Sequence, residues 1–117
     1  MSLNINITYQ GLPPSPALSA DLYERALKLA RFAPRLQSCL ITVRRSERRH
    51  HKGNRFLVSV QATMPGGEFK AGRTCDADQS HQDAYVAAHD AMDALRRQLE
   101  DFVRVQRDKQ QQPGIAP

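Results

Sequence analysis

Apolar and polar residues alternate one by one in four segments of the chain. In residues 3–9 every second position is apolar, from Leu3 to Tyr9, which is the period of a half-buried β-strand. The same period recurs at Cys39, Ile41 and Val43, at Phe56, Val58, Val60 and Ala62, and at Phe69 and Ala71. The pattern predicts four strands. Residues 64–67, Met-Pro-Gly-Gly, have the composition of a type II turn between the last two, because glycine tolerates the positive φ that follows the proline.

Two longer segments have the spacing of three and four residues that is typical of an amphipathic helix. The first follows Ser15, a suitable N-cap, and Pro16, and it runs to about Phe32 before Pro34 ends it. Its buried side would carry Leu18, Leu22, Ala26 and Leu29. The second begins after residues 80–83, where Ser80 and Asp83 have the spacing of a capping box, and continues to about residue 109. Its apolar face consists of Tyr85, Ala88, Met92, Leu95, Leu99 and Phe102.

The order β-α-β-β-β-α predicts an α+β fold in which two helices pack on one face of a four-stranded sheet. Length allows one core, so we expect a single domain over residues 1–109 and a disordered tail over residues 110–117. The core would contain Leu18, Leu22, Leu29, Ile41, Val58, Val60, Tyr85, Met92, Leu95 and Leu99. The other face of the sheet would be polar and wet, with Thr42, Arg44, Ser59, Gln61, Lys70 and Thr74.

Charge narrows the class of partner. The chain has 17 Lys and Arg against 12 Asp and Glu, a formal charge of +5, which favours polyanions and nucleic acid first. No apolar stretch approaches the roughly 20 residues that span a membrane, and the first residues lack the apolar core of a signal peptide, so we expect a soluble cytoplasmic protein. Cys39 and Cys75 lack Cys-x-x-Cys spacing and alternate with apolar neighbours, which favours buried free thiols.

Basic residues gather in two places. On the first helix they are three or four residues apart and form one stripe opposite the leucines: Arg25, Lys28, Arg31 and Arg35. Such a stripe can follow phosphates, although an ordinary solvated helix face has the same spacing. The second group is a predicted loop with six Lys or Arg and one acid, and it contains Arg44, Arg45, Arg48, Arg49, His50, His51, Lys52 and Arg55. A loop of this charge suits a polyanion; the alternative is a solvated flexible connection.

Other candidate chemistry is weak. Adjacent His50 and His51 point in different directions and have no third ligand nearby, so we expect no metal, and His81 and His89 are interpreted as surface residues. On the last helix, pairs at i, i+4 spacing would largely neutralise one another: Arg97 with Asp93 or Asp101, and Glu100 with Arg96 or Arg104. No glycine-rich phosphate loop, nucleophile elbow or metal-binding histidine spacing occurs. We therefore expect no enzyme, no cofactor and no small-molecule substrate.

The amino-acid sequence of residues 83–99 and of three further segments resembles that of one protein family. Residues 4–8 resemble its first strand, residues 17–36 its first helix and residues 64–69 its hairpin, all in the right order. The family is that of the ribosome hibernation-promoting factors, also called ribosome-associated translation inhibitors. The resemblance implies a fold similar to double-stranded RNA-binding domains. It also implies a monomer that binds the small ribosomal subunit and its rRNA under stress, in the mRNA and tRNA channel. The sequence resembles the short family members. Long members pair ribosomes through an additional C-terminal domain, so we do not expect this chain to dimerise ribosomes in that way.

Resemblance and charge together give a set of expected RNA-binding residues. The set contains Arg25, Lys28, Arg31, Arg35, Arg44, Arg45, Arg48, Arg49, His50, His51, Lys52, Arg55, Arg96 and Arg97. The chain departs from the family at Ala94, Glu100 and Asp101, where members usually carry basic residues. Two alternatives therefore stay open. One is a general RNA-binding module with the same fold, and the other is a protein interaction domain that docks through Val103 and its apolar neighbours on the last helix.

Overall fold

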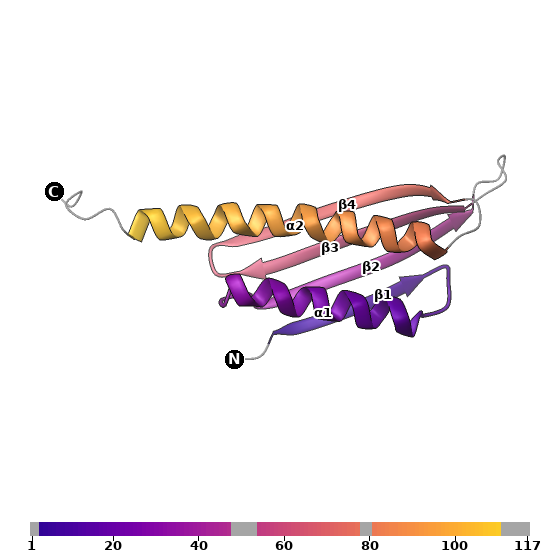
Figure 1. The fold of residues 1–117 in the computed structure, drawn as a ribbon, viewed down its shortest axis with the longest axis horizontal. Coiled ribbons are helices and arrows are strands. Elements are labelled where there is room, and N and C mark those ends of the chain that lie inside the picture. Colours follow the sequence, from indigo (N-terminus) through magenta and orange to yellow (C-terminus); the bar gives the residue numbers. More distant parts are fainter. Residues whose placement is uncertain (1–2, 48–53, 78–80, 111–117) are drawn as a thin grey trace.

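Six elements follow one another in the order that the hydrophobic pattern predicts. The computed structural model describes residues 3–47, 54–77 and 81–110 (Figure 1). Its elements are β1 (Asn4–Gln10), α1 (Pro16–Phe32), β2 (Ser38–Glu47), β3 (Asn54–Met64), β4 (Gly67–Ala77) and α2 (His81–Gln110). Gln110, which was expected to open the tail, is the last residue of α2 instead.

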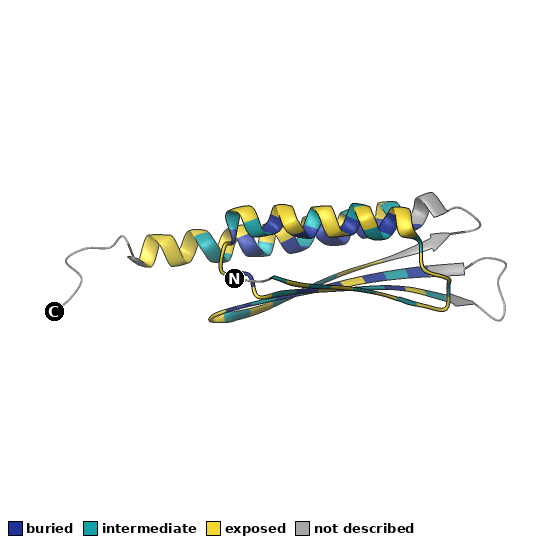
Figure 2. Cartoon of the chain, turned by 90° about the horizontal axis from the view of Figure 1, so that it is seen from below, coloured by how far each residue is buried: buried dark blue, intermediate teal, exposed yellow. Residues whose placement is uncertain are grey.

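The four strands form one sheet with the spatial order β1-β2-β3-β4. β1 and β2 are parallel, with Ile5 opposite Cys39, whereas β2, β3 and β4 form an antiparallel meander. A parallel pair needs a crossover, and α1 supplies it. Both helices lie on the same side of the sheet (Figure 2), so the predicted α+β architecture is confirmed. No helix in the described ranges is long and apolar enough to span a membrane.

The core lies between the sheet and the two helices. Nine of the ten predicted core residues are buried, and Leu22, Leu95 and Leu99 are completely inaccessible. The exception is Tyr85, which is only half-buried with its ring edge-on to His89. At 100° per residue Tyr85 lies about 80° from Leu95 around the helix, so it occupies the flank of the buried face and not its centre.

The opposite face of the sheet is open, as the alternation predicts. Arg44, Ser59 and Lys70 are exposed there, and Gln61 donates a hydrogen bond of 2.6 Å to Glu68 on the neighbouring strand. Leu40 also lies on this face and is exposed. The side chain of Thr74 lies outside the described residues. This polar surface needs no covering layer.

β2 and β3 extend beyond the residues in which apolar positions alternate. The prediction of a loop over residues 44–55 is therefore wrong at both of its ends. Arg44 and Arg45 lie inside β2, and Arg55 lies inside β3, where its Cα is paired with that of Ser46. Charged side chains end the hydrophobic alternation, but they do not prevent backbone pairing between antiparallel strands. Arg48, Arg49, His50, His51 and Lys52 lie outside the described residues.

Local signals at two element ends act as predicted. The Ser15 hydroxyl accepts a hydrogen bond of 3.2 Å from the Leu18 N–H and thereby caps α1. Gly66 has a φ of +86°, the left-handed value that a type II turn requires after Pro65. The proposed capping box of α2 lies outside the described side chains.

Truncating the centre of the core tests this packing. Leu95→Ala removes a side chain that is 0% exposed, and the cavity should lower the free energy of unfolding by about 2 to 5 kcal/mol. Val86→Ala is the matched control, because Val86 lies on the same helix but is 55% exposed and should change stability by less than about 0.5 kcal/mol. Urea denaturation measures both, and equal effects would contradict the assignment of the buried face.

Candidate nucleic-acid interface

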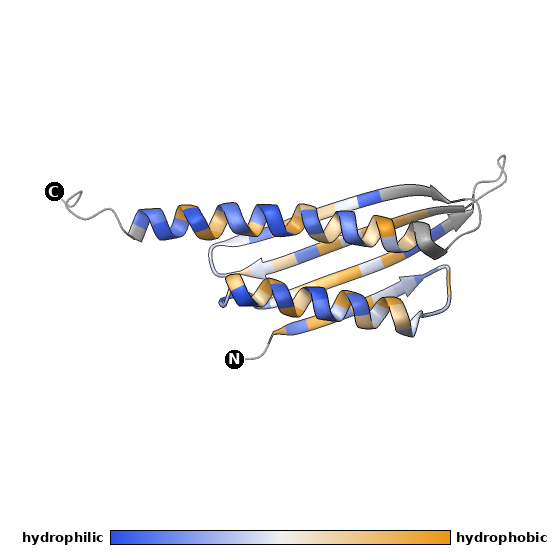
Figure 3. Cartoon of the chain, in the orientation of Figure 1, coloured by the Kyte–Doolittle hydropathy of each residue, from blue (hydrophilic) through white to orange (hydrophobic). Residues whose placement is uncertain are grey.

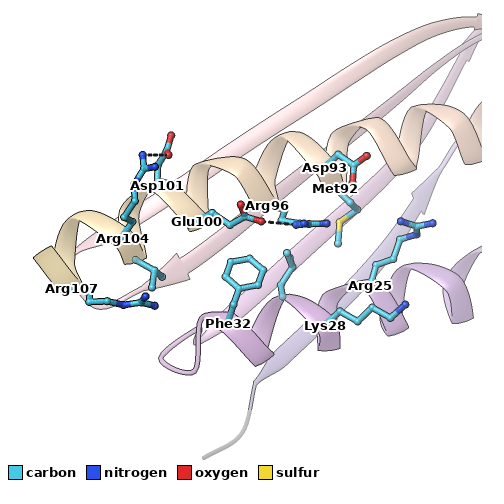
Figure 4. Close-up of a pocket in the computed structure, with 12 residues that line it drawn as sticks. Arg25, Lys28, Phe32, Met92, Asp93, Arg96, Glu100, Asp101, Arg104 and Arg107 are labelled. Atoms are coloured by element: carbon cyan, nitrogen blue, oxygen red, sulfur yellow. Dashed lines mark hydrogen bonds and ion pairs between the residues drawn. The ribbon is translucent and has the colours of Figure 1, made fainter.

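An open groove of about 600 Å³ runs between α1 and α2 on the helix layer. Apolar side chains form its floor, namely Leu29, Phe32, Met92 and Val103. Its walls are charged, and Figure 4 shows side chains of the two helices extending toward this groove. Basic residues outnumber acidic ones: Arg25, Lys28, Arg96, Arg104 and Arg107 against Asp93, Glu100 and Asp101.

The two helices present these side chains because of their period. On α1, Leu22, Ala26 and Leu29 face the sheet, and this orientation leaves Arg25 and Lys28 on the side toward α2. On α2, Leu95 and Leu99 are inward, so Arg96 and Arg107 fall on the flank toward α1. The groove is therefore fixed by the burial of the leucines beneath it.

Two acidic residues of the groove are hydrogen-bonded to arginines of α2. Arg96 Nε donates to Glu100 Oε1 at 2.6 Å, and Arg104 donates to Asp101 Oδ1 at 2.8 Å (Figure 4). The hydrogen bond and the charge of Glu100 raise the pKa of Arg96. The predicted pair of Glu100 with Arg96 is confirmed. Arg104 bonds Asp101 in place of Glu100, and Arg97 forms no ion pair with any described residue, so that prediction is wrong.

The cations at the C-terminal end of α1 and in the turn after it have no such acidic partners among the described residues. Lys28, Arg31 and Arg35 are exposed and form no ion pair within the described part of the chain, and the same is true of Arg107 on α2. Their charge is therefore available to an external anion. Arg25 differs, because its guanidinium lies 3.3 Å from the Asp21 carboxylate one turn earlier.

Asp21 also joins the two helices. His89 Nε2 lies 2.5 Å from its carboxylate, so a residue interpreted from sequence as a surface histidine is half-buried and bonded to α1. The helices lie close enough for this contact because they pack side by side on the same face of the sheet, α1 against β1 and α2 against β3 and β4. Burial raises the pKa of Asp21, but the hydrogen bond from His89 and the charges of Arg25 and His89 outweigh it, so the net pKa is lowered.

The structure does not bring the expected RNA-binding residues together on one surface. Arg25, Lys28 and Arg96 line the groove, whereas Arg97 is exposed on α2 outside it. Because neighbouring residues of a strand point to opposite faces, Arg44 lies on the open sheet face and Arg45, which is half-buried, does not. The pair also lies toward the end of the sheet that is opposite to the C-terminal end of α1 (Figure 1).

Arg35 requires a further correction. It was placed on the first helix, but α1 ends at Phe32 and Arg35 lies in the turn that follows. The reason is Pro34, which cannot continue the helical hydrogen bonds. Arg35 nevertheless remains close to Arg31, because both line a second groove at this end of α1.

Sequence reasoning missed the C-terminal half of the interface. Arg104 and Arg107 continue the flank of Arg96, and Phe32 contributes an aromatic ring to the floor. The helical spacing of the two arginines is visible in the sequence, but their acidic neighbours suggest a largely neutralised face. Which acids each arginine bonds is decided by rotamers that spacing does not specify.

Cys39 has no role at this interface. It is completely buried as a free thiol, as predicted, and desolvation raises its pKa to about 11. It therefore stays protonated and unreactive at neutral pH. The Cys75 side chain lies outside the described residues. Within the residues that the structure describes, no cluster of three His, Cys, Asp or Glu could hold a metal ion.

Asp21→Asn tests the contact between the helices. The folded state lowers the pKa of Asp21 below the unfolded value of about 3.9, so the carboxylate stabilises the fold above that pH. We expect the variant to lose about 0.5 to 1 kcal/mol at neutral pH. The deficit should shrink as pH falls below about 4, because Asp21 then protonates in the wild type as well.

Glu24→Gln is the matched control, because Glu24 is an exposed acid of the same helix without an ion pair to a described residue. Urea denaturation at several pH values measures both variants. A deficit of Asp21→Asn that is independent of pH would show that the carboxylate charge does not stabilise the contact.

Comparisons with known proteins agree with this fold. No curated protein matches the chain. A solved structure, a ribosomal subunit interface protein from Coxiella burnetii, is similar with 20% identity and a TM-score of 0.63, over 85% of this chain and 96% of that one. The N-terminal domain of Protein Y from Thermus thermophilus is similar with 18% identity and a TM-score of 0.67, over 85% and 98% of the two chains.

The family comparison covers most of the sequence. Residues 5–107 match the family described as sigma 54 modulation protein / S30EA ribosomal protein. This match extends from β1 to the last turns of α2 and confirms the resemblance to the hibernation-promoting factors. The chain therefore belongs to the sigma 54 modulation protein / S30EA ribosomal protein family.

Proposed function

We propose that this protein binds the small ribosomal subunit as a monomer, in the channel for mRNA and tRNA, and thereby inhibits initiation under stress. Its family is one of ribosome-associated modulation proteins and not of enzymes. The observation that carries the proposal is a set of exposed cations that form no ion pair with any described residue. They lie in the C-terminal half of α1, in the turn after it and on α2, namely Lys28, Arg31, Arg35 and Arg107. Binding, and not chemistry, is the activity.

The electrostatics of the groove support an RNA partner. Phosphates attract exposed lysine and arginine strongly, and each neutralised phosphate releases counterions. Glu100 and Asp101 depart from the family pattern, but each is bonded to an arginine of its own helix, which reduces their repulsion of phosphate. The diluted charge of α2 is therefore compatible with RNA binding when α1 supplies the unpaired cations.

The competing interpretation is a general RNA-binding module that has kept the fold without the ribosomal site. The two interpretations differ in selectivity and not in charge. Binding to purified small subunits and to an arbitrary RNA duplex at the same salt concentration separates them. Tighter binding to subunits supports the proposal, whereas equal affinity per phosphate supports the general module.

Removing two groove cations should weaken subunit binding. The double variant Lys28→Ser, Arg31→Ser should lose about two phosphate contacts, which lowers the logarithmic salt slope by about 1.5 and the affinity at about 0.1 M salt roughly 30-fold. The matched control is Lys70→Ser, Arg73→Ser on β4, which removes the same net charge from exposed positions outside both grooves. Equal losses in the two variants would contradict a localised interface.

Occupancy of the channel has a second consequence. If about four phosphates are contacted, the salt slope is near 3, and raising salt from about 0.05 to 0.2 M should lower affinity roughly 60-fold. Initiator tRNA bound to the subunit should compete with the protein. Equilibrium binding across this salt range, with and without tRNA, measures both effects. Simultaneous binding of protein and tRNA would exclude the channel.

A further inference from the structure

A second groove, of about 520 Å³, lies at the C-terminal end of α1. Three segments form it: the turn after α1 with Pro34 and Arg35, the β3–β4 turn with Pro65, and the part of α2 that contains Phe102 and Gln106. The β3–β4 turn packs closely on α2, because a Cβ at Gly66 would lie 3.6 Å from Phe102 Cζ. The groove is thus open to solvent and lined by elements that are distant in sequence.

The two sides of this groove differ in chemistry. Its floor contains two half-buried aromatic rings, Phe32 and Phe102, and the latter is supported edge-on by Phe69 at a centroid distance of 5.0 Å. Its rim carries Arg31, Arg35 and Arg107, which are exposed and form no ion pair with a described residue. Among the residues that the structure describes, none of those lining this groove is acidic, in contrast to the first groove.

We propose that this second groove binds single-stranded RNA, with an unstacked base on the aromatic floor and its phosphates on the arginine rim. The inference rests on the proposed function only for the class of partner. A nucleotide combines a flat apolar base with an adjacent phosphate, which matches an aromatic floor beside guanidinium groups. A duplex keeps its bases stacked inside and offers phosphates alone, so it cannot use the floor.

The two grooves join at their common residues. Phe32, Val103 and Arg107 line both of them, and Figure 4 shows the Phe32 ring projecting from α1 toward α2. A strand seated on Phe32 can therefore continue past Lys28 along the first groove. Binding of a base on Phe32 would then determine where the next phosphates of the same RNA strand lie in the first groove.

Fluorescence anisotropy with labelled RNA tests the proposal. The probes are an oligouridylate of about ten nucleotides, within the range of single-strand binding sites, and a duplex with the same strand length. We expect the wild type to prefer the single strand. Phe32→Ala should weaken oligouridylate binding about tenfold, the loss typical of removing one stacking ring, while duplex binding changes little. Equal affinity for both probes in the wild type would overturn the proposal.

Variants that keep the fold make the test independent of stability. Phe32→Trp retains a stacking surface and should bind the oligouridylate at least as tightly as the wild type. Arg35→Ser removes an exposed rim charge and should weaken it, whereas Val105→Ala, an exposed position of α2 outside both grooves, should not. If Phe32→Trp loses affinity as Phe32→Ala does, with wild-type melting temperatures, stacking is excluded.

Competition identifies the class of partner. Polyglutamate offers carboxylates without bases, and we expect it to displace oligouridylate poorly. Displacement as efficient as by unlabelled oligouridylate would overturn the proposal in favour of an acidic protein partner. Binding to purified small subunits distinguishes this inference from the proposed function. A protein that binds subunits but does not prefer single-stranded RNA refutes the inference alone. A protein that does not bind subunits refutes the proposed function, and the oligouridylate experiment then still decides whether the groove binds single-stranded RNA.

Discussion

The burial of one apolar sheet face by two helices is the constraint on which the rest of the structure depends. Ile41, Val43, Val58 and Val60 present a continuous apolar surface, and one helix is too narrow to cover it. Two helices side by side cover it, and their flanks then face each other across a groove. Figure 3 shows hydrophilic and hydrophobic residues alternating along both helices. The flanks lie at the boundary between the apolar and polar sides of each helix, so the groove has charged walls and a partly apolar floor. The candidate interface is thus a direct consequence of how the core is closed.

Charge is distributed unequally between the two helices. α2 neutralises much of its own charge through the Arg96–Glu100 and Arg104–Asp101 pairs. On α1 Arg25 pairs with Asp21, whereas Lys28 and Arg31 form no ion pair in the described part of the chain. Exposed pairs of this kind contribute little to stability, so their main effect is on the field that a partner meets. The basic residues without an ion pair to a described residue therefore gather near the C-terminal end of α1, where Arg31, Arg35 and Arg107 line one groove.

The fold could be predicted from sequence because its signals are local, whereas the interface depends on residues far apart in the chain. Alternation in residues 3–9 identifies a strand, and the Pro65–Gly66 turn identifies the connection between the last two strands, without tertiary knowledge. The extension of β2 to Glu47 was missed because it rests on backbone pairing. Gly11 also shows this limit: its φ is +78°, and a Cβ there would lie 2.3 Å from the Arg45 carbonyl oxygen. Only the folded sheet reveals that close approach.

The unequal length of the helices explains why a second groove exists. At 1.5 Å per residue α1 is about 26 Å long and α2 about 45 Å, so the last turns of α2 extend beyond its neighbour (Figure 1). Leu99 is the last fully buried residue of α2, and beyond it Phe102 is half-buried at the edge of the core, with Phe69 edge-on to its ring and the β3–β4 turn close by. A shorter α2 would lack both Phe102 and Arg107. The added length therefore contributes little to the core, and it creates an aromatic and cationic surface where α1 has ended.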